Sequence, residues 1–76
     1  MNMEIAPRIA VDPNIHFGKP VIKGTRVPVH VLVAKVAGGM LPVDVASEYG
    51  VTIDDVLAAL SFAAQTLEQQ EFRVFA

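Results

Sequence analysis

The longest hydrophobic pattern in the chain lies in its C-terminal third. From residue 53 to residue 69, apolar residues recur every three or four positions. Thr52 and Asp55 stand where a capping box would begin a helix. The pattern predicts a helix over about 53–69 whose apolar stripe consists of Ile53, Val56, Leu57, Leu60, Ala64 and Leu67. Because Ala59, Phe62 and Ala63 widen that stripe, we expect this helix to be buried on more than one side.

Residues 28–37 also have apolar positions at helical spacing, at Val29, Leu32, Val33 and Val36. Pro28 suits the start of a helix, and Gly38-Gly39 suits a left-handed stop. The valines at positions 27, 29, 31 and 33 alternate as in a strand, so both helix and strand stay open for 29–37. The proline start and the glycine stop favour the helix.

Residues 42–49 predict a second, shorter helix between Pro42 and Gly50. Its inward side is expected to hold Val43, Ala46 and Tyr49. Small residues at 46 and 50 before the buried position 56 are typical of a tight crossing of two helices. The segment 42–64 therefore predicts a helix-turn-helix.

The N-terminal part of the chain predicts a small β element. Residues 1–7 lack periodicity and are expected to form a loose terminus. Residues 8–11 suit a short strand that pairs with residues 20–22, and such a pair must lie on the helices to be stable. We therefore expect a single domain, 1–76, that divides after its loose terminus into a β element or arm (8–27), a three-helix unit (28–70) and a tail that docks (71–76).

The chain is apolar for its length. Hydrophobic residues make up 53% of its 76 residues and the mean hydropathy is +0.46, although so short a chain has little interior in which to bury them. The surplus predicts a homodimer through the helix at 53–69, with an interface of Leu60, Phe62, Ala63 and Leu67. The sequence has no cysteine, no signal-peptide pattern and no run of the roughly 18–20 apolar residues that span a bilayer. We therefore expect a cytoplasmic protein without membrane contact.

Charge is divided unevenly along the chain. Residues 1–35 hold five basic and two acidic residues, a net charge of +3, whereas residues 36–76 hold one basic and six acidic residues, a net charge of −5. The predicted helix at 53–69 starts with Asp54 and Asp55, and no Lys or Arg occurs from residue 51 to residue 72. Since DNA affinity rests largely on phosphate neutralisation, recognition of DNA by this helix is not favoured.

The segment 18–28 concentrates glycine, proline and basic residues. It does not match the phosphate-binding loop G-x-x-x-x-G-K-[ST], because five residues separate Gly18 from Gly24 and Lys23 precedes the second glycine. Its cations are instead predicted to contact a protein partner, and they are Lys19, Lys23 and Arg26. A structural hairpin with exposed basic side chains is the alternative.

No pattern in the sequence indicates catalysis or metal binding. His16 and His30 stand fourteen positions apart without cysteine, which makes a poor metal site. The neighbouring Asp54 and Asp55 suit the start of a helix, and no nucleophile, base and oxyanion site assemble. We expect no enzyme activity, no metal, no cofactor and no small-molecule substrate.

Residues 8–13 (RIAVDP) and 18–29 (GKPVIKGTRVPV), with Gly39-Met40 and the helix that follows, resemble the bacterial domain-of-unknown-function family 433. The likeness covers residues 8–67 and is most specific in the pattern G-K-P-x-I-x-G-T-R. The resemblance marks Lys19 and Arg26 as part of the family signature. It also marks signature residues with a structural role, which are Gly18, Pro20, Ile22, Gly24 and Thr25. The resemblance implies a mainly α fold: a three-helix helix-turn-helix or homeodomain-like domain with a short N-terminal β element.

Members of that family are often predicted antitoxins, similar to VapB-type proteins and encoded beside a PIN-like nuclease toxin. The resemblance therefore implies a non-enzymatic protein that binds and inhibits such a toxin and helps to repress its own operon. Two alternatives stay open. The chain could be a DNA-binding regulator that uses its basic N-terminal arm, or a purely structural homodimerisation module.

Overall fold

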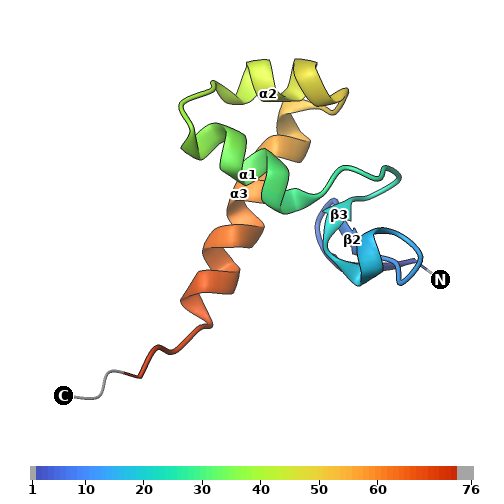
Figure 1. The fold of residues 1–76 in the computed structure, drawn as a ribbon, viewed down its shortest axis with the longest axis vertical. Helices are drawn as coiled ribbons and strands as arrows, with labels where there is room; N and C mark the ends of the chain where they lie inside the picture. Colours follow the sequence, from blue (N-terminus) through green and yellow to red (C-terminus); the bar gives the residue numbers. More distant parts are fainter. Residues whose placement is uncertain (1, 74–76) are drawn as a thin grey trace.

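The computed structural model describes residues 2–73. A small antiparallel sheet lies beside three helices, and the third helix is the longest element (Figure 1). A mainly α fold with an N-terminal β element is thus confirmed. The elements are β1 (Met3–Ala6), β2 (Ile9–Val11), the 3-10 turn η1 (His16–Gly18), β3 (Val21–Ile22), α1 (Val29–Ala37), α2 (Pro42–Tyr49) and α3 (Ile53–Glu68).

The sheet has the strand order β1-β2-β3. Ile9 of β2 lies opposite Ile22 of β3, and Ala10 lies opposite Val21. All four side chains are buried. The predicted pairing of residues 8–11 with residues 20–22 is therefore confirmed.

The prediction of a loose terminus over residues 1–7 is wrong, because Met3–Ala6 form β1 and pair with β2. The chain reverses between the two strands through Pro7 and Arg8, and Arg8 has a φ of +67°. Turn positions with positive φ are usually occupied by Gly or Asn, so an arginine there gave no turn signal. The Arg8 backbone N–H donates to Glu4 Oε2 at 3.3 Å, which adds a bond across this reversal.

Residues 29–37 form a helix, which rules out the alternating strand. α1 begins directly after Pro28 and buries Val29 and Leu32. The Gly38 N–H donates to the Ala34 carbonyl oxygen at 2.9 Å, and the next residue, Gly39, has a φ of +106°. The predicted glycine stop is confirmed.

α2 follows its predicted bounds, and Ala46 and Tyr49 pack against the core as predicted, but Val43 does not. It ends at Gly50, whose φ is +68°. Val45 is fully buried, whereas Val43, which was expected to face inward, is 55% exposed. A helix of eight residues makes little more than two turns, so its apolar period leaves two faces nearly equivalent until tertiary packing selects one.

α3 starts as the capping-box pattern predicts. The Asp55 N–H donates to Thr52 Oγ1 at 3.1 Å, and the Thr52 N–H donates to Asp55 Oδ2 at 3.0 Å. The helix ends at Glu68, one residue before the predicted position. Neither α3 nor any other helix within residues 2–73 combines the length and apolar character needed to cross a bilayer.

The hydrophobic core lies where the sheet, α1 and α2 meet the first half of α3. On α3 only Val56 and Ala59 are buried, while Ile53 and Leu57 of the predicted stripe are 46% and 49% exposed. No polar or charged side chain is buried among residues 2–73. The buried residues are Ile9, Ala10, Val21, Ile22, Val29, Leu32, Val45, Ala46, Val56 and Ala59.

The second half of α3 runs away from the other elements (Figure 1). The radius of gyration is 13.3 Å, whereas a compact domain of this length would have about 11 Å. After the helix, residues 71–73 have no regular structure and Phe72 is 79% exposed. The predicted docking of the tail 71–76 is therefore not seen for residues 71–73, and residues 74–76 lie outside the described residues.

Substitution of Leu32 tests whether this residue belongs to the hydrophobic core. Its side chain is fully buried, so Leu32→Ala should leave a cavity and lower the free energy of unfolding by about 2–5 kcal/mol. Leu41 is 62% exposed, and Leu41→Ala is the matched control; it should change that free energy by less than about 0.5 kcal/mol. Urea unfolding followed by circular dichroism measures both variants, and equal losses would contradict the assignment.

Candidate partner-binding surface

The segment between β2 and β3 contains a turn with unusual backbone geometry. Three successive residues have positive φ: His16 at +49°, Phe17 at +58° and Gly18 at +84°. The left-handed conformation costs about 1–2 kcal/mol for each residue other than glycine. Gly18 adopts it freely, so the turn holds two strained residues, His16 and Phe17.

Hydrogen bonds hold this turn from both sides. The Gly18 N–H donates to the Ile15 carbonyl oxygen at 3.1 Å, and the Lys19 N–H donates to the His16 carbonyl oxygen at 3.1 Å. His16 also donates from Nε2 to the Arg26 carbonyl oxygen at 2.9 Å. The surrounding chain thus fixes the strained conformation, as strained residues require.

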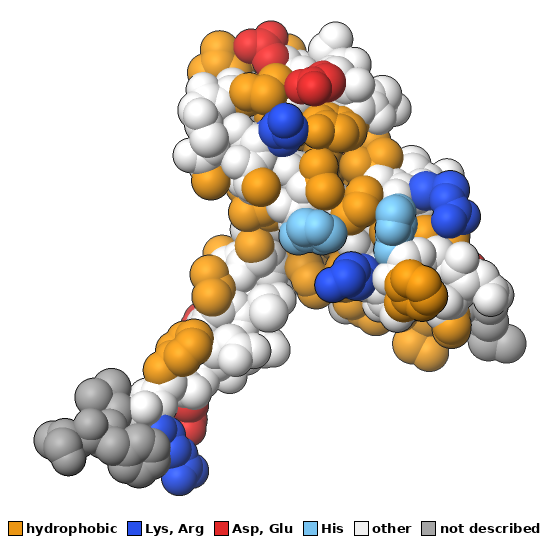
Figure 2. All heavy atoms as spheres, viewed as in Figure 1, with side chains coloured by type: hydrophobic (Ala, Val, Ile, Leu, Met, Phe, Trp, Pro, Cys, Tyr) orange, Lys and Arg blue, Asp and Glu red, His pale blue; other side chains and the backbone are white. Residues whose placement is uncertain are grey.

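The turn displays an aromatic ring and stands next to two cations. Phe17 is 100% exposed. Lys19 follows it two positions later, and the bond from His16 brings the backbone of Arg26 to the same turn. Figure 2 shows a face of the molecule on which basic and histidine side chains lie among apolar ones.

The three predicted partner-binding cations differ in their surroundings. Lys23 Nζ donates to Glu4 Oε1 at 2.8 Å. That hydrogen bond, a second one from the Arg8 backbone and the charge of Lys23 lower the pKa of Glu4. Lys19 and Arg26 are exposed and form no ion pair within residues 2–73. Lys23 is therefore engaged within the chain, whereas Lys19 and Arg26 are available to a partner.

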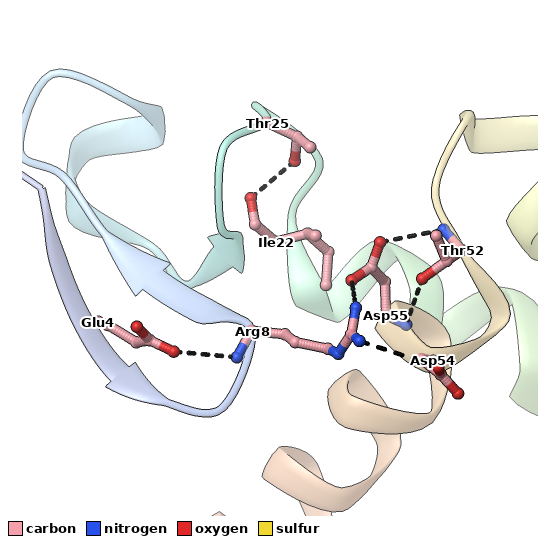
Figure 3. A network of polar contacts seen from close by, with 7 residues as sticks. All are labelled: Glu4, Arg8, Ile22, Thr25, Thr52, Asp54 and Asp55. Carbon is pink, nitrogen blue, oxygen red and sulfur yellow. Dashed lines mark hydrogen bonds and ion pairs between the residues drawn. The ribbon is translucent and has the colours of Figure 1, made fainter.

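A cation that the sequence analysis did not single out joins the sheet to α3 (Figure 3). Arg8 Nη1 donates to Asp55 Oδ1 at 3.0 Å, and Arg8 Nη2 lies 3.8 Å from Asp54 Oδ2. Burial raises the pKa of Asp55, but hydrogen bonds from Thr52 and Arg8, with the charge of Arg8, outweigh it and leave that pKa lowered. Arg8 and Asp55 are 47 positions apart, so local spacing gave no signal for this contact.

The signature residues make contacts within the fold. Thr25 Oγ1 donates to the Ile22 carbonyl oxygen at 2.8 Å (Figure 3). The same oxygen accepts from the Val27 N–H at 3.0 Å. Gly24 has a φ of +80°. The Pro20 carbonyl oxygen accepts from the first N–H of α1 at 3.0 Å. Thr25 and Gly24 therefore shape the turn after β3, and Pro20 joins the residue before β3 to the start of α1.

A groove of about 470 Å³ lies between α1 and the second half of α3. Its lining is mostly apolar and also includes Lys19 and His30. Three of the four predicted dimer residues line it, namely Phe62, Ala63 and Leu67, whereas Leu60 does not. The groove therefore brings the predicted dimer residues together with one of the two available arm cations.

The two histidines have separate surroundings. His16 holds the turn, and His30 lines the groove. Within residues 2–73, no three His, Asp or Glu side chains come together as the ligands of a metal ion would.

Comparison with protein families gives a match over residues 9–63, to the family described as protein of unknown function, DUF433. The chain belongs to the DUF433 family. Among solved structures, the crystal structure of Rv2018 from Mycobacterium tuberculosis is similar, with 35% sequence identity and a TM-score of 0.63. The match covers 68% of this chain and 24% of the Rv2018 chain, so it spans about a quarter of that protein. Comparison with curated proteins gives no match.

The DUF433 match confirms the family indicated by the signature pattern. It contains the strained turn, Lys19 and Arg26, and it ends at residue 63, before Leu67. β1 and Arg8 precede it. The exposed ring and the two available cations thus lie inside the family region, whereas the contact between Arg8 and Asp55 depends on a residue just outside it.

Substitution of Asp55 tests whether its contacts stabilise the junction between the sheet and α3. Asp55→Asn should lower the free energy of unfolding at pH 7 by about 1–2 kcal/mol, because a neutral amide cannot replace a carboxylate that accepts from both Thr52 and Arg8. The folded-state pKa of Asp55 is lowered. Its stabilisation is therefore present above the unfolded-state pKa and is lost as the pH falls through the folded-state pKa.

The control for this experiment is Asp54→Asn, which removes the same charge from a side chain that is 67% exposed and 3.8 Å from Arg8. Urea unfolding at about pH 7 and at successively lower pH follows the loss of the Asp55 stabilisation. We expect the variants to differ at about pH 7 and to converge as the pH falls through the lowered folded-state pKa of Asp55. Equal stability of the two variants at pH 7 would show that the Asp55 contacts do not hold the junction.

Proposed function

We propose that this DUF433 chain is a non-enzymatic, antitoxin-like protein that binds and inhibits a PIN-like nuclease in the cytoplasm. The observation that carries the proposal is the pair of available cations, Lys19 and Arg26, on a fixed arm beside an apolar groove. Metal-dependent nucleases hold their ions with carboxylates. Exposed cations complement such a site, and inhibition by contact needs no chemistry of the chain's own.

Charge favours a protein partner over DNA. Lys19 and Arg26 would neutralise about two phosphates, whereas proteins with strongly salt-dependent DNA binding make about 6–10 phosphate contacts. The carboxylates of Asp54 and Asp55 stand at the start of α3, and the chain has a net charge of −2. DNA binding by the arm, and with it repression of the operon, is the second candidate function and predicts an affinity that falls with salt.

We propose that α2 and α3 form a helix-turn-helix whose role is to support the fold. α2 ends at Tyr49 and α3 begins at Ile53, so three residues connect them, with left-handed Gly50 first. A connection of about three to four residues with glycine is typical of a helix-turn-helix. Because Asp55 is engaged by Thr52 and Arg8, we assign the start of α3 to holding the fold and not to reading bases.

We further propose a homodimer in which the second half of α3 enters the groove of a second copy. Residues 64–68 are all exposed, and a short isolated helix is marginal in water. The same helix lines the groove, so two copies related by a two-fold axis would present matching surfaces. Glu68 near the end of α3 also carries the charge opposite to that of Lys19 in the groove.

The antitoxin proposal implies a gene for a PIN-like nuclease beside the gene of this chain, and it is tested with the product of that neighbouring gene. An equimolar amount of the chain should inhibit that nuclease in a fluorescent RNA cleavage assay. The double variant Lys19→Glu/Arg26→Glu should inhibit about tenfold less well, because reversed charges slow encounter with a carboxylate-rich site. Lys35→Glu, which alters another exposed cation, should inhibit normally.

An unaltered chain that leaves the nuclease fully active would overturn the antitoxin proposal. Titration of a labelled duplex from the upstream region of its own gene, at about 50 mM and 200 mM salt, then tests DNA binding. An affinity that falls steeply with salt and is lost in the double variant would establish the second candidate function.

Leu67 tests the dimer. Leu67 is 64% exposed, so Leu67→Asp should leave the fold of one chain intact. Burying the new carboxylate in the groove of a second copy is unfavourable, so light scattering should show at least a tenfold weaker dimer. Leu41→Asp alters a leucine that is 62% exposed and does not line the groove, and should leave the dimer unchanged. A dimer that survives Leu67→Asp has its interface elsewhere.

A further inference from the structure

Phe17 occupies a position where the fold itself would favour another residue. Its φ of +58° suits glycine or asparagine better than phenylalanine. Its ring is 100% exposed and therefore contributes nothing to the hydrophobic core. The residue lowers the stability of the free chain through backbone strain, and its exposed ring adds no stabilisation that would offset that strain.

The strained turn also fixes the backbone that carries the ring. His16 and Gly18, on either side of Phe17, are both hydrogen-bonded to other parts of the arm. Ordering a loop on binding lowers affinity, so an aromatic residue whose backbone is already held binds with less loss of entropy. Aromatic residues are enriched in protein interfaces, and a few buried ones carry most of the binding energy.

We propose that Phe17 is the aromatic anchor of the arm and inserts into an apolar pocket on the partner protein. Lys19 and Arg26 stand beside it and pair with carboxylates at the edge of that pocket. This inference rests on the proposed antitoxin function and specifies how the nuclease is held. This arm therefore fits a partner surface that has a pocket for a phenyl ring and acidic side chains around that pocket.

The surroundings of the Phe17 ring favour a protein over a nucleic acid as the partner that contacts it. Phe17 does not line the groove assigned to the second copy, so the anchor and the dimer use different surfaces. Single-stranded nucleic acid also stacks on aromatic rings, but it needs a positively charged channel along its backbone. The chain has a net charge of −2, and its third arm cation, Lys23, is paired with Glu4.

Two substitutions at the same position separate the anchor from the fold. Phe17→Ala removes the ring and keeps a residue that is strained at positive φ, so the midpoint of thermal unfolding should stay unchanged. Phe17→Gly removes the ring and the strain, so that midpoint should rise by about 4–8 °C. Both variants should bind the nuclease at least about 30-fold more weakly in isothermal titration calorimetry.

Phe72→Ala is the matched control, because Phe72 is an exposed phenylalanine outside the arm; its affinity should equal that of the unaltered chain. If the unaltered chain binds the nuclease and Phe17→Ala binds equally well, the anchor is wrong and the antitoxin proposal stands. If Phe17→Ala loses the homodimer in light scattering, the ring belongs to the contact between copies and the anchor is again wrong. If the unaltered chain does not bind the nuclease, both proposals fail.

Discussion

The burial of Ile9 and Ile22 against the helices is the contact on which the rest of the structure depends. A sheet whose strands have four, three and two residues is not stable by itself. Burying each isoleucine contributes about 1.5–3 kcal/mol, whereas an exposed ion pair contributes about 0–1 kcal/mol. Arg8 is half-exposed where it meets α3, so the apolar contact contributes more than the Arg8 ion pairs to holding the sheet in place. The fixed position of the sheet in turn fixes the strained turn beside the groove.

Sequence signals predicted those parts of the fold that local chemistry determines. Proline starts, glycine stops and the Thr52–Asp55 capping box act over a few residues, so the three helices and their bounds could be predicted. Tertiary contacts determined the rest. Val45 and not Val43 faces inward because packing selected one of two similar faces of a short helix. β1 was missed because its turn depends on a positive φ at Arg8, which no residue preference indicates.

The candidate surface was predictable only in part, because it too depends on tertiary contacts that local sequence does not indicate. Composition identified the basic arm, but the cations available to a partner depend on contacts between distant residues. Lys23 is neutralised by Glu4, 19 positions away, which leaves Lys19 and Arg26. Phe17 gave no signal at all, because a phenylalanine is expected in the core and neither its backbone conformation nor its exposure follows from hydrophobic spacing.

Stability and binding are linked in this small domain, because both proposed interfaces use apolar groups that add no stability to the free chain. The ring of Phe17 and the apolar end of α3 both remain in water when the chain is alone. A partner that covers either one stabilises the fold by mass action, in proportion to its concentration relative to its dissociation constant. Lys19 lies where the two surfaces meet, since it follows the strained turn and lines the groove. Because the proposed dimer sets Glu68 of the second copy against Lys19, the dimer and the nuclease would compete for this cation, so each would weaken the other's binding.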